Sequence, residues 1–330
     1  MEVEIQNENF RPGTHTEIKD VIFKFTLPGW EHAALGDSIA WLPAIIHVAK
    51  NYNYVRGHLI VPEWFMVIAM NVLKEYPHWK VYSKIPDSLM DGVHVFEMKK
   101  ELPNATVMPL VDLGFIRFGG FYPVPKGAEV YPLLDLERTK LHKSVPELYA
   151  VLTPGSSAVT RKMPATTYNG ISEYLLSKGI TPVHLGTESM NGGKRAIDID
   201  SDYDRTLGID LVGKTSIIEA AKIMEDAAMV IGIDNGLLHL AAMTDTTILY
   251  GFTMVGPNHR RITRKYGQTF ELYGDKEKLP CLFCQENVRF FFGHNFEECI
   301  YKLNVPDCVK MLNLESWTKT IDLAMGEGNG

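Results

Sequence analysis

The sequence predicts an α/β protein with two successive parallel sheets. Short apolar runs typical of buried strands alternate with amphipathic stretches at helical spacing along most of the chain. The alternation is interrupted between about residues 119 and 146 by an irregular, proline-rich stretch. Strands separated by helices favour parallel sheets with helices on both faces. We therefore expect two facing domains, with a ligand cleft between them at the carboxyl ends of the strands.

The first domain is predicted to span residues 1–145. A strand at 21–25 leads through a loop to a helix at 38–51, whose apolar side chains repeat at helical spacing. Asp37 or Ser38 is the expected N-cap of this helix, because a short side-chain oxygen can accept hydrogen bonds from the first free amides. The other expected elements are a helix at 63–75 and strands at 58–62, 81–83, 93–96 and 106–113.

The second domain is predicted to span residues 146–312, and residues 313–330 to form a terminal helix, at 316–325, and a frayed tail. Its strands follow one another at the spacing of a second α/β series. The expected elements are strands within 148–157 and at 182–186, 229–233 and 246–251, with helices at 166–178, 215–227 and 236–243.

Composition and charge narrow the class of protein. The 330 residues are 45% hydrophobic and 22% charged, which is ordinary globular usage and excludes disordered, collagen-like and disulfide-scaffold classes. The net charge of −7 excludes a wholly basic surface for nucleic acid. We find neither an apolar run near the roughly 18 residues of a membrane span nor a secretory signal. We therefore expect a cytoplasmic protein with reduced cysteines.

Two loops after predicted strands carry candidate functional residues. Gly36 and Asp37 precede the first helix, where glycine allows close approach of a ligand and the aspartate is either a plain N-cap or a general base. In the second domain, a turn that includes Gly155, Ser156 and Ser157 can bind phosphate through amides and hydroxyls, and cations beyond it can neutralise charge. These cations are Arg161 and Lys162, whose ordinary alternative role is a solvated pair.

The densest candidate site follows the strand at 229–233. Asp234 can accept hydrogen bonds from hydroxyls, Asn235 and Gly236 can present amides to a phosphate, and His239 lies one turn further along the helix. Taken alone, His239 reads as a buried core histidine. The combination of Asp, Asn, Gly and His at the end of a strand favours a ligand site.

At these residues the chain resembles glycosyltransferase family 9, the ADP-heptose-dependent heptosyltransferases. The resemblance runs from about Lys24 to Leu312, with the motifs in order. The matching segments are Gly36-Asp37 with Pro43, Pro154–Ser157 with Arg161–Pro164, Leu211–Ser216 and Asp234–Ala242. The family pattern usually has Lys at the position of Arg161, Trp at Met163, and Ser or Thr at Asn235, so the resemblance does not specify the donor sugar.

The resemblance implies a GT-B fold, in which two Rossmann-like domains face each other across a cleft, and inverting transfer of a hexosyl, heptosyl or pentosyl group from an ADP- or UDP-linked sugar. The general base of the family falls on Asp37. The donor-binding positions fall on Gly36, Gly155, Ser156, Ser157, Arg161, Lys162, Lys214, Thr215, Asp234, Asn235, Gly236 and His239. Since basic groups and amides carry the leaving diphosphate, no catalytic metal is expected.

The four cysteines form a cluster between residues 281 and 308, as Cys281, Cys284, Cys299 and Cys308. A C-x2-C pair can chelate one ion, and two further thiolates complete a tetrahedron that suits structural Zn or Fe. The alternative is four unrelated thiols, and His294 is a possible substitute ligand. With the segments Gly36–Pro43 and Gly251–Thr253, the cluster resembles the bacterial autotransporter heptosyltransferases, which glycosylate protein hydroxyls and carry a four-cysteine iron-binding finger.

The acceptor stays open between protein Ser/Thr, a saccharide and a modified base of DNA. The stretch 255–268 holds Arg260, Arg261, Arg264 and Lys265, and Phe290–Phe292 lie nearby. Cations interleaved with aromatics can grip a phosphate backbone and stack bases, although the plainer interpretation is a solvated basic face. A non-catalytic nucleotide-sugar-binding assembly protein is a second alternative. The cysteine finger and the phenylalanines are compatible with a homo-oligomer.

Overall fold

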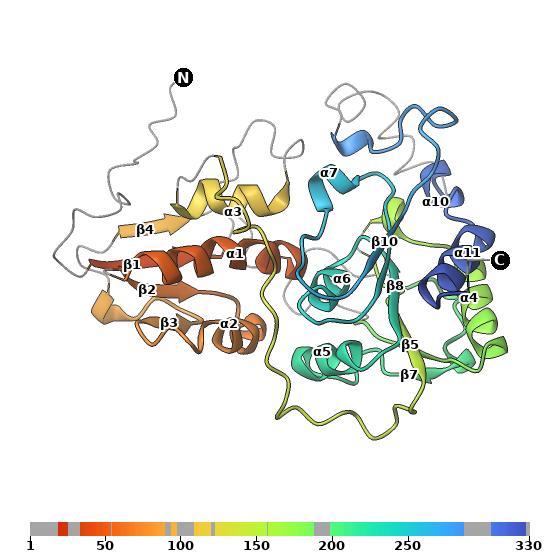
Figure 1. The fold of residues 1–330 in the computed structure, drawn as a ribbon, viewed down its shortest axis with the longest axis horizontal. Helices are drawn as coiled ribbons and strands as arrows, with labels where there is room; N and C mark the ends of the chain where they lie inside the picture. The colour runs from red at the N-terminus through yellow and green to blue at the C-terminus, as the bar shows by residue number, and fades with distance from the viewer. Residues whose placement is uncertain are drawn as a thin grey trace. The chain divides into compact units, whose positions relative to one another are not determined.

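The computed structural model describes residues 19–25, 34–53, 55–89, 94–97, 109–119, 123–156, 158–187, 199–286 and 305–327. These residues form two compact units, one up to Asp135 and one from Leu136 onward (Figure 1). Between Pro123 and Leu148 the chain forms neither helix nor strand. This passage includes the predicted boundary between residues 145 and 146.

The first unit holds a four-stranded, all-parallel sheet with the order β3-β2-β1-β4. In the register of the sheet, Val21 of β1 lies beside Gly57 on one side and His94 on the other. The strands are β1 (Lys19–Lys24), β2 (Val55–Ile60), β3 (Trp79–Tyr82) and β4 (His94–Glu97). Because all pairs are parallel, β1 and β4 flank the point where the strand order reverses, and ligands of such sheets bind beyond that point.

Three α-helices accompany this sheet, and two of them pack side by side. They are α1 (Leu35–Asn51), α2 (Met66–Leu73) and α3 (Leu110–Gly119), with short 3-10 turns η2 (Glu63–Phe65) and η3 (Asp87–Leu89). α1 contacts α3 closely: a Cβ added to Gly114 of α3 would lie 3.1 Å from the Cα of Trp41 in α1. The buried rings of Phe25 and Phe118 pack against Trp41, and Phe23 packs against Phe118 in the same core.

Two predictions for this unit are wrong. The segment 106–113 was expected to be a strand, but residues 110–119 form a helix, because a short apolar run alone does not distinguish a buried strand from a buried helix. The first helix begins at Leu35, so neither Asp37 nor Ser38 is its N-cap. Ala34 holds that position, and its carbonyl accepts the Ser38 amide at 2.9 Å. Ser38 points into the core and is fully buried.

The second unit holds a six-stranded, all-parallel sheet with the order β10-β9-β8-β5-β6-β7. Counted along the chain, this is the strand order of the dinucleotide-binding α/β fold, and its order reverses between β5 and β8. The strands are β5 (Tyr149–Leu152), β6 (Thr181–His184), β7 (Ile209–Asp210), β8 (Met229–Ile233), β9 (Ile248–Gly251) and β10 (Thr269–Leu272).

Helices cover both faces of this sheet. Figure 1 shows α4 and α11 on one face and α5 and α6 on the other, which confirms the predicted α/β layering. The helices are α4 (Ala165–Ser177), α5 (Ile217–Glu225), α6 (Gly236–Ala241), α7 (Pro257–Arg260), α10 (Asp307–Lys310) and α11 (Leu314–Ala324), with 3-10 turns η4 (Val159–Arg161), η5 (Arg205–Leu207) and η6 (Cys284–Glu286). No helix in the described part of the chain is both long and apolar enough to cross a membrane.

Candidate active site

The candidate site of the second unit lies where its strand order reverses, beyond the carboxyl ends of β5 and β8. β5 continues into the loop from Thr153 to η4, and β8 continues directly into Asp234 and α6. The two loops are joined at their base by Asn235, whose amide nitrogen donates to the Thr153 carbonyl at 3.1 Å and to the Thr153 hydroxyl at 3.0 Å. The close packing here requires Gly232, because a Cβ at that position would lie 2.1 Å from the Thr153 hydroxyl.

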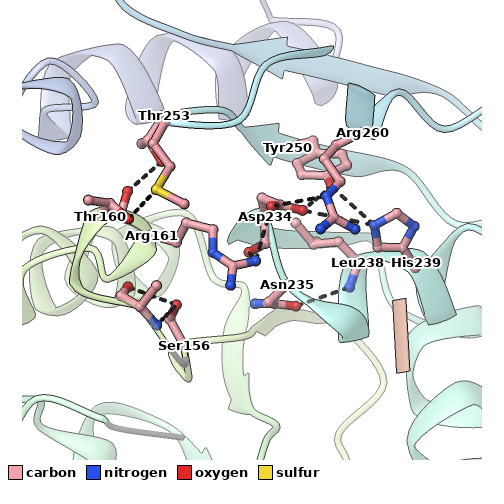
Figure 2. A network of polar contacts seen from close by, with 12 residues as sticks. Ser156, Thr160, Arg161, Asp234, Asn235, Leu238, His239, Tyr250, Thr253 and Arg260 are labelled. Atoms are coloured by element: carbon pink, nitrogen blue, oxygen red, sulfur yellow. Dashed lines mark hydrogen bonds and ion pairs between the residues drawn. The ribbon is translucent and has the colours of Figure 1, made fainter. Parts of the chain in front are cut away.

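Asp234 is the centre of the site. Its side chain is 2% exposed, and its carboxylate accepts a hydrogen bond from the Tyr250 hydroxyl at 2.7 Å. Two guanidinium groups approach the other carboxylate oxygen, from Arg161 at 3.2 Å and from Arg260 at 3.8 Å (Figure 2). The His239 ring, itself buried, reaches Asp234 at 3.9 Å and the Tyr250 hydroxyl at 3.5 Å.

The charge state of Asp234 follows from these neighbours. Burial alone would raise the pKa of the carboxyl, because the charged form is disfavoured away from water. The guanidinium of Arg260, the hydrogen bond from His239 and the guanidinium of Arg161 outweigh burial and hold the pKa well below its usual range. Asp234 is therefore an anion between two cations, and the group carries a surplus of positive charge that an anionic ligand can neutralise.

α6 is capped by a side chain rather than by a ligand. The side-chain oxygen of Asn235 accepts the amides of Leu237 and Leu238, at 2.9 and 3.2 Å (Figure 2). Two of the first free amides of this helix are thereby satisfied within the protein. The cations of Arg161 and Arg260, rather than those two amides, are the donors best placed for an anion.

The structure brings Arg161, Asp234, Asn235 and His239 together, but other predicted donor-binding residues lie elsewhere. Ser156 is buried and its hydroxyl bonds to the backbone of Ala158, while the half-exposed Gly155 precedes it. Ser157 lies outside the described residues. Lys162 is half-buried beyond Arg161. Gly155 and Ser156 thus lie in the loop between β5 and η4, and Lys162 directly follows η4.

Lys214 and Thr215 lie at the carboxyl end of β7, which is separated from β8 by β6 and β5. Lys214 pairs with Asp210 at 2.9 Å within its own loop, and Thr215 precedes Ser216, the N-cap of α5. In the first unit, Gly36 is buried and Asp37 is half-buried, both in the first turn of α1. There the helix dipole favours a carboxylate.

Sequence reasoning missed two residues of the site. Tyr250 lies in β9 and looked like an ordinary core aromatic, and Arg260 was assigned to a basic stretch. The direction of Arg260 depends on the four-residue helix α7, whose short length left no periodic signal. The one available clue was position, since Tyr250 lies in the strand next to β8 and Arg260 follows that strand.

The cysteine cluster is described only in part. Cys281, Cys284 and Cys308 are half-buried, and Cys299 lies outside the described residues, as do His294 and Phe290–Phe292. Within the ranges that the structure covers, no three His, Cys, Asp or Glu side chains are grouped so that they could share a metal ion. The predicted metal finger is therefore not shown.

The protein is an α/β protein with a parallel sheet of this strand order, and the two guanidinium groups where the order reverses suit an anionic ligand. The sequence pattern of glycosyltransferase family 9 (heptosyltransferase) matches residues 121–286, half of the chain. The chain belongs to glycosyltransferase family 9.

Individual relatives agree with this assignment. The chain is 26% identical to lipopolysaccharide heptosyltransferase 1 of Pseudomonas aeruginosa over 166 residues, which are 49% of this chain. The match spans less than half, 43%, of that relative.

Solved structures share the fold. The iron-containing dodecameric glycosyltransferase TibC of enterotoxigenic Escherichia coli superposes with a TM-score of 0.69 at 16% identity, covering 94% of this chain and 77% of TibC. TibC in complex with ADP-D-β-D-heptose gives the same TM-score at 15% identity, covering 97% of this chain and 82% of that TibC chain. The E. coli heptosyltransferase WaaC with ADP gives a TM-score of 0.56 at 12% identity, covering 92% of this chain and 99% of WaaC. The α/β fold with parallel sheets thus matches GT-B heptosyltransferase structures.

Proposed function

We propose that the chain is an inverting glycosyltransferase that moves a sugar from a nucleotide-diphosphate donor to an acceptor hydroxyl. The observation that carries this proposal is the buried Asp234 carboxylate between the guanidinium groups of Arg161 and Arg260. Its surplus positive charge suits a diphosphate, and its place beyond β5 and β8 suits a nucleotide. Family membership and a relative solved with ADP-D-β-D-heptose support this donor class, with ADP- and UDP-linked sugars as the candidates.

In the proposed reaction, the acceptor oxygen attacks the anomeric carbon of the donor sugar. The bond from that carbon to the diphosphate oxygen breaks, and its electron pair leaves with the nucleotide diphosphate. Asp37 takes the proton of the acceptor hydroxyl. Arg161 and Arg260 balance the growing charge of the leaving diphosphate, and Asp234 holds both cations in place.

The remaining predicted donor contacts belong to the same proposal. Gly36 permits close approach near the base, and the turn at Gly155–Ser157 and Lys162 face the phosphates. The loop at Lys214 and Thr215 serves the nucleoside side of the donor, and His239 supports Asp234 from α6. Each of these proposed roles is based on the place of the residue in the segment that follows the carboxyl end of a strand.

For the acceptor, we favour a hydroxyl of a protein or a saccharide over a modified DNA base. The basic stretch that suggested DNA is engaged within the protein. Arg260 is committed to Asp234, and Arg261 pairs with Glu271 at 3.2 Å. The Arg264 guanidinium donates to the carbonyls of Thr246 and Tyr266.

We also propose that the four cysteines hold a structural Fe or Zn ion, and that the chain forms a homo-oligomer. Thiolates suit both metals, and TibC is described as iron-containing and dodecameric. Among the described residues, no three His, Cys, Asp or Glu side chains are grouped around one point. The proposed ion has a structural role and takes no part in the proposed reaction. Elemental analysis of the purified chain tests it: about one ion per chain that is lost in Cys281→Ser supports the site, and a metal-free wild type refutes it.

The function is tested by incubating the purified chain with a panel of ADP- and UDP-linked sugars. Release of nucleotide diphosphate and calorimetric donor binding are measured for the wild type and for Asp37→Asn. We expect the variant to bind donor like the wild type and to lose at least about a hundredfold in turnover, because a general base contributes at least that factor. Unchanged turnover would remove Asp37 from the role.

Donor binding without hydrolysis or transfer by the wild type, with protein and saccharide acceptors present, would favour the non-catalytic alternative. Mass spectrometry of protein, saccharide and DNA from cells that express the chain identifies the acceptor. A sugar retained on DNA alone would reverse our preference among the acceptors.

A further inference from the structure

The segment Cys281–Glu286 packs against the loop that leads from β9 to α7 and Arg260. Phe283 donates its amide to the Thr253 carbonyl at 3.2 Å, and Gln285 donates to the Met254 carbonyl at 3.0 Å. Three residues after Met254, α7 begins and leads to Arg260. The segment is thus hydrogen-bonded to the backbone that leads to one of the two cations.

The same backbone is joined to the other cation. The Thr253 hydroxyl donates to the Thr160 carbonyl at 2.6 Å, and the Thr160 hydroxyl contacts the Met254 sulfur at 2.7 Å (Figure 2). Thr160 directly precedes Arg161 in η4. A chain of contacts therefore runs from the Cys281–Glu286 segment through residues 253 and 254 to both guanidinium groups.

Glu286 is the polar anchor of this segment on α7. Gly256, the N-cap of α7, has no side chain to accept a hydrogen bond. The His259 amide donates both to the Gly256 carbonyl and to the Glu286 carboxylate, each at 3.2 Å. The fit is tight, since a Cβ on Gly256 would lie 2.6 Å from that carboxylate oxygen and 2.7 Å from the Phe283 ring. The Glu286 carboxylate thus replaces the missing cap.

We infer that Glu286 is a positioning residue for the anion site, acting through α7 on Arg260. A helix of four residues has little stability of its own, so its orientation depends on contacts from outside. Loss of the Glu286 cap frees α7 to fray, and the Arg260 guanidinium then loses its fixed distance to Asp234. This inference rests on the proposed function, because donor affinity is what the position of Arg260 controls.

A double-mutant cycle tests the inference, with ADP and UDP as calorimetric probes and the better binder used throughout. Glu286→Ala is expected to raise the dissociation constant about three- to tenfold, the range that a lost cap gives when converted to affinity. Glu286→Gln keeps an acceptor oxygen and is expected to bind within about twofold of the wild type. Glu277→Ala, at an exposed glutamate nearby, is the matched control and is expected to change nothing.

The coupling between Glu286→Ala and Arg260→Ala shows whether Glu286 positions Arg260 or whether its loss disturbs the structure generally. If Glu286 acts through Arg260, then Glu286→Ala in an Arg260→Ala background weakens binding no further. Multiplicative effects of the two changes, or wild-type affinity in Glu286→Ala, would overturn the inference. If Glu286→Ala does not fold, Gly256→Ala tests the same interface from the α7 side and is expected to weaken binding equally. Absence of binding by the wild type would instead refute the proposed function.

Discussion

At the scale of the residue, the site consists of one buried anion, Asp234, and two partly buried cations, Arg161 and Arg260. Asp234 keeps its charge because Arg260, His239 and Arg161 outweigh the cost of burial. A single arginine would leave the group neutral overall, and the second one makes it an acceptor of anions. In the function that we propose, Arg260 is therefore the residue that lets this ion pair bind an anion.

Replacing Asp234 with Asn tests this arrangement. The variant keeps an acceptor for Tyr250 but leaves two guanidinium groups without their anion, so the free energy of unfolding is expected to fall by on the order of 3 kcal/mol. Denaturant titration measures the loss. Asp307→Asn, which breaks the exposed pair with Lys310, is the control. Its free energy of unfolding is expected to fall by less than about 0.5 kcal/mol. Equal effects of the two changes would contradict the central role of Asp234.

A second buried residue predicts a pH dependence of stability. His184, at the end of β6, is fully buried with its ring nitrogen bonded to the Tyr203 hydroxyl, and burial lowers its pKa to about 4. The unfolded chain, with an ordinary histidine pKa of about 6.5, binds the proton more readily, so stability is complete above that pH and decreases as the pH falls toward 4.

This contribution of His184 amounts to at most about 3 kcal/mol. Unfolding free energies between pH 7 and pH 4.5 measure it, and the imidazole resonance of His184 is expected to stay in its neutral form above pH 5. A His184 resonance that titrates near pH 6.5 would contradict this prediction.

At the scale of the element, short side chains fix the starts of two helices of the second unit, α5 and α6. Asn235 caps α6 and ties it to β5, and Ser216 caps α5 in a reciprocal pair with Glu219. α7 has no such residue of its own and takes its cap from Glu286. The helices with local caps were predicted from the sequence within a few residues, whereas α7, whose cap comes from a distant segment, was not predicted.

The capping box of α5 gives a prediction at this scale. Ser216→Ala removes the acceptor of the Glu219 amide, and the free energy of unfolding is expected to fall by about 1 kcal/mol. Thermal and denaturant unfolding measure the change, and Ser201→Ala in an exposed turn serves as the control. A stability equal to that of the wild type would show that α5 depends on packing rather than on its cap.

At the scale of the whole molecule, the chain is acidic, and three arginines of its densest basic stretch are paired within the second unit. The net charge is −7, and Arg260, Arg261 and Arg264 are all engaged in contacts within the second unit. Affinity for nucleic acid depends on cations that are available to phosphates. The molecule as a whole is therefore poorly suited to a DNA acceptor.

Electrophoretic mobility shifts with double-stranded DNA check this conclusion. At about 150 mM salt we expect no complex below a dissociation constant of about 100 μM, the weak limit of non-specific binding. Arg261→Ala is expected to leave this result unchanged, because Arg261 already pairs with Glu271. A salt-dependent complex of micromolar affinity that Arg261→Ala weakens would restore DNA as a candidate acceptor.

The sequence by itself determined the α/β class with parallel sheets and the segments after β5 and β8 that carry Arg161 and Asp234, because apolar periodicity acts over a few residues. It misassigned the helix at 110–119, since an apolar run suits either a buried helix or a buried strand. Only the tertiary structure decided that Arg260 and Tyr250 meet Asp234 and that Glu286 caps α7. Those contacts join residues that are distant in the chain, and a local sequence pattern does not predict which distant side chains will meet.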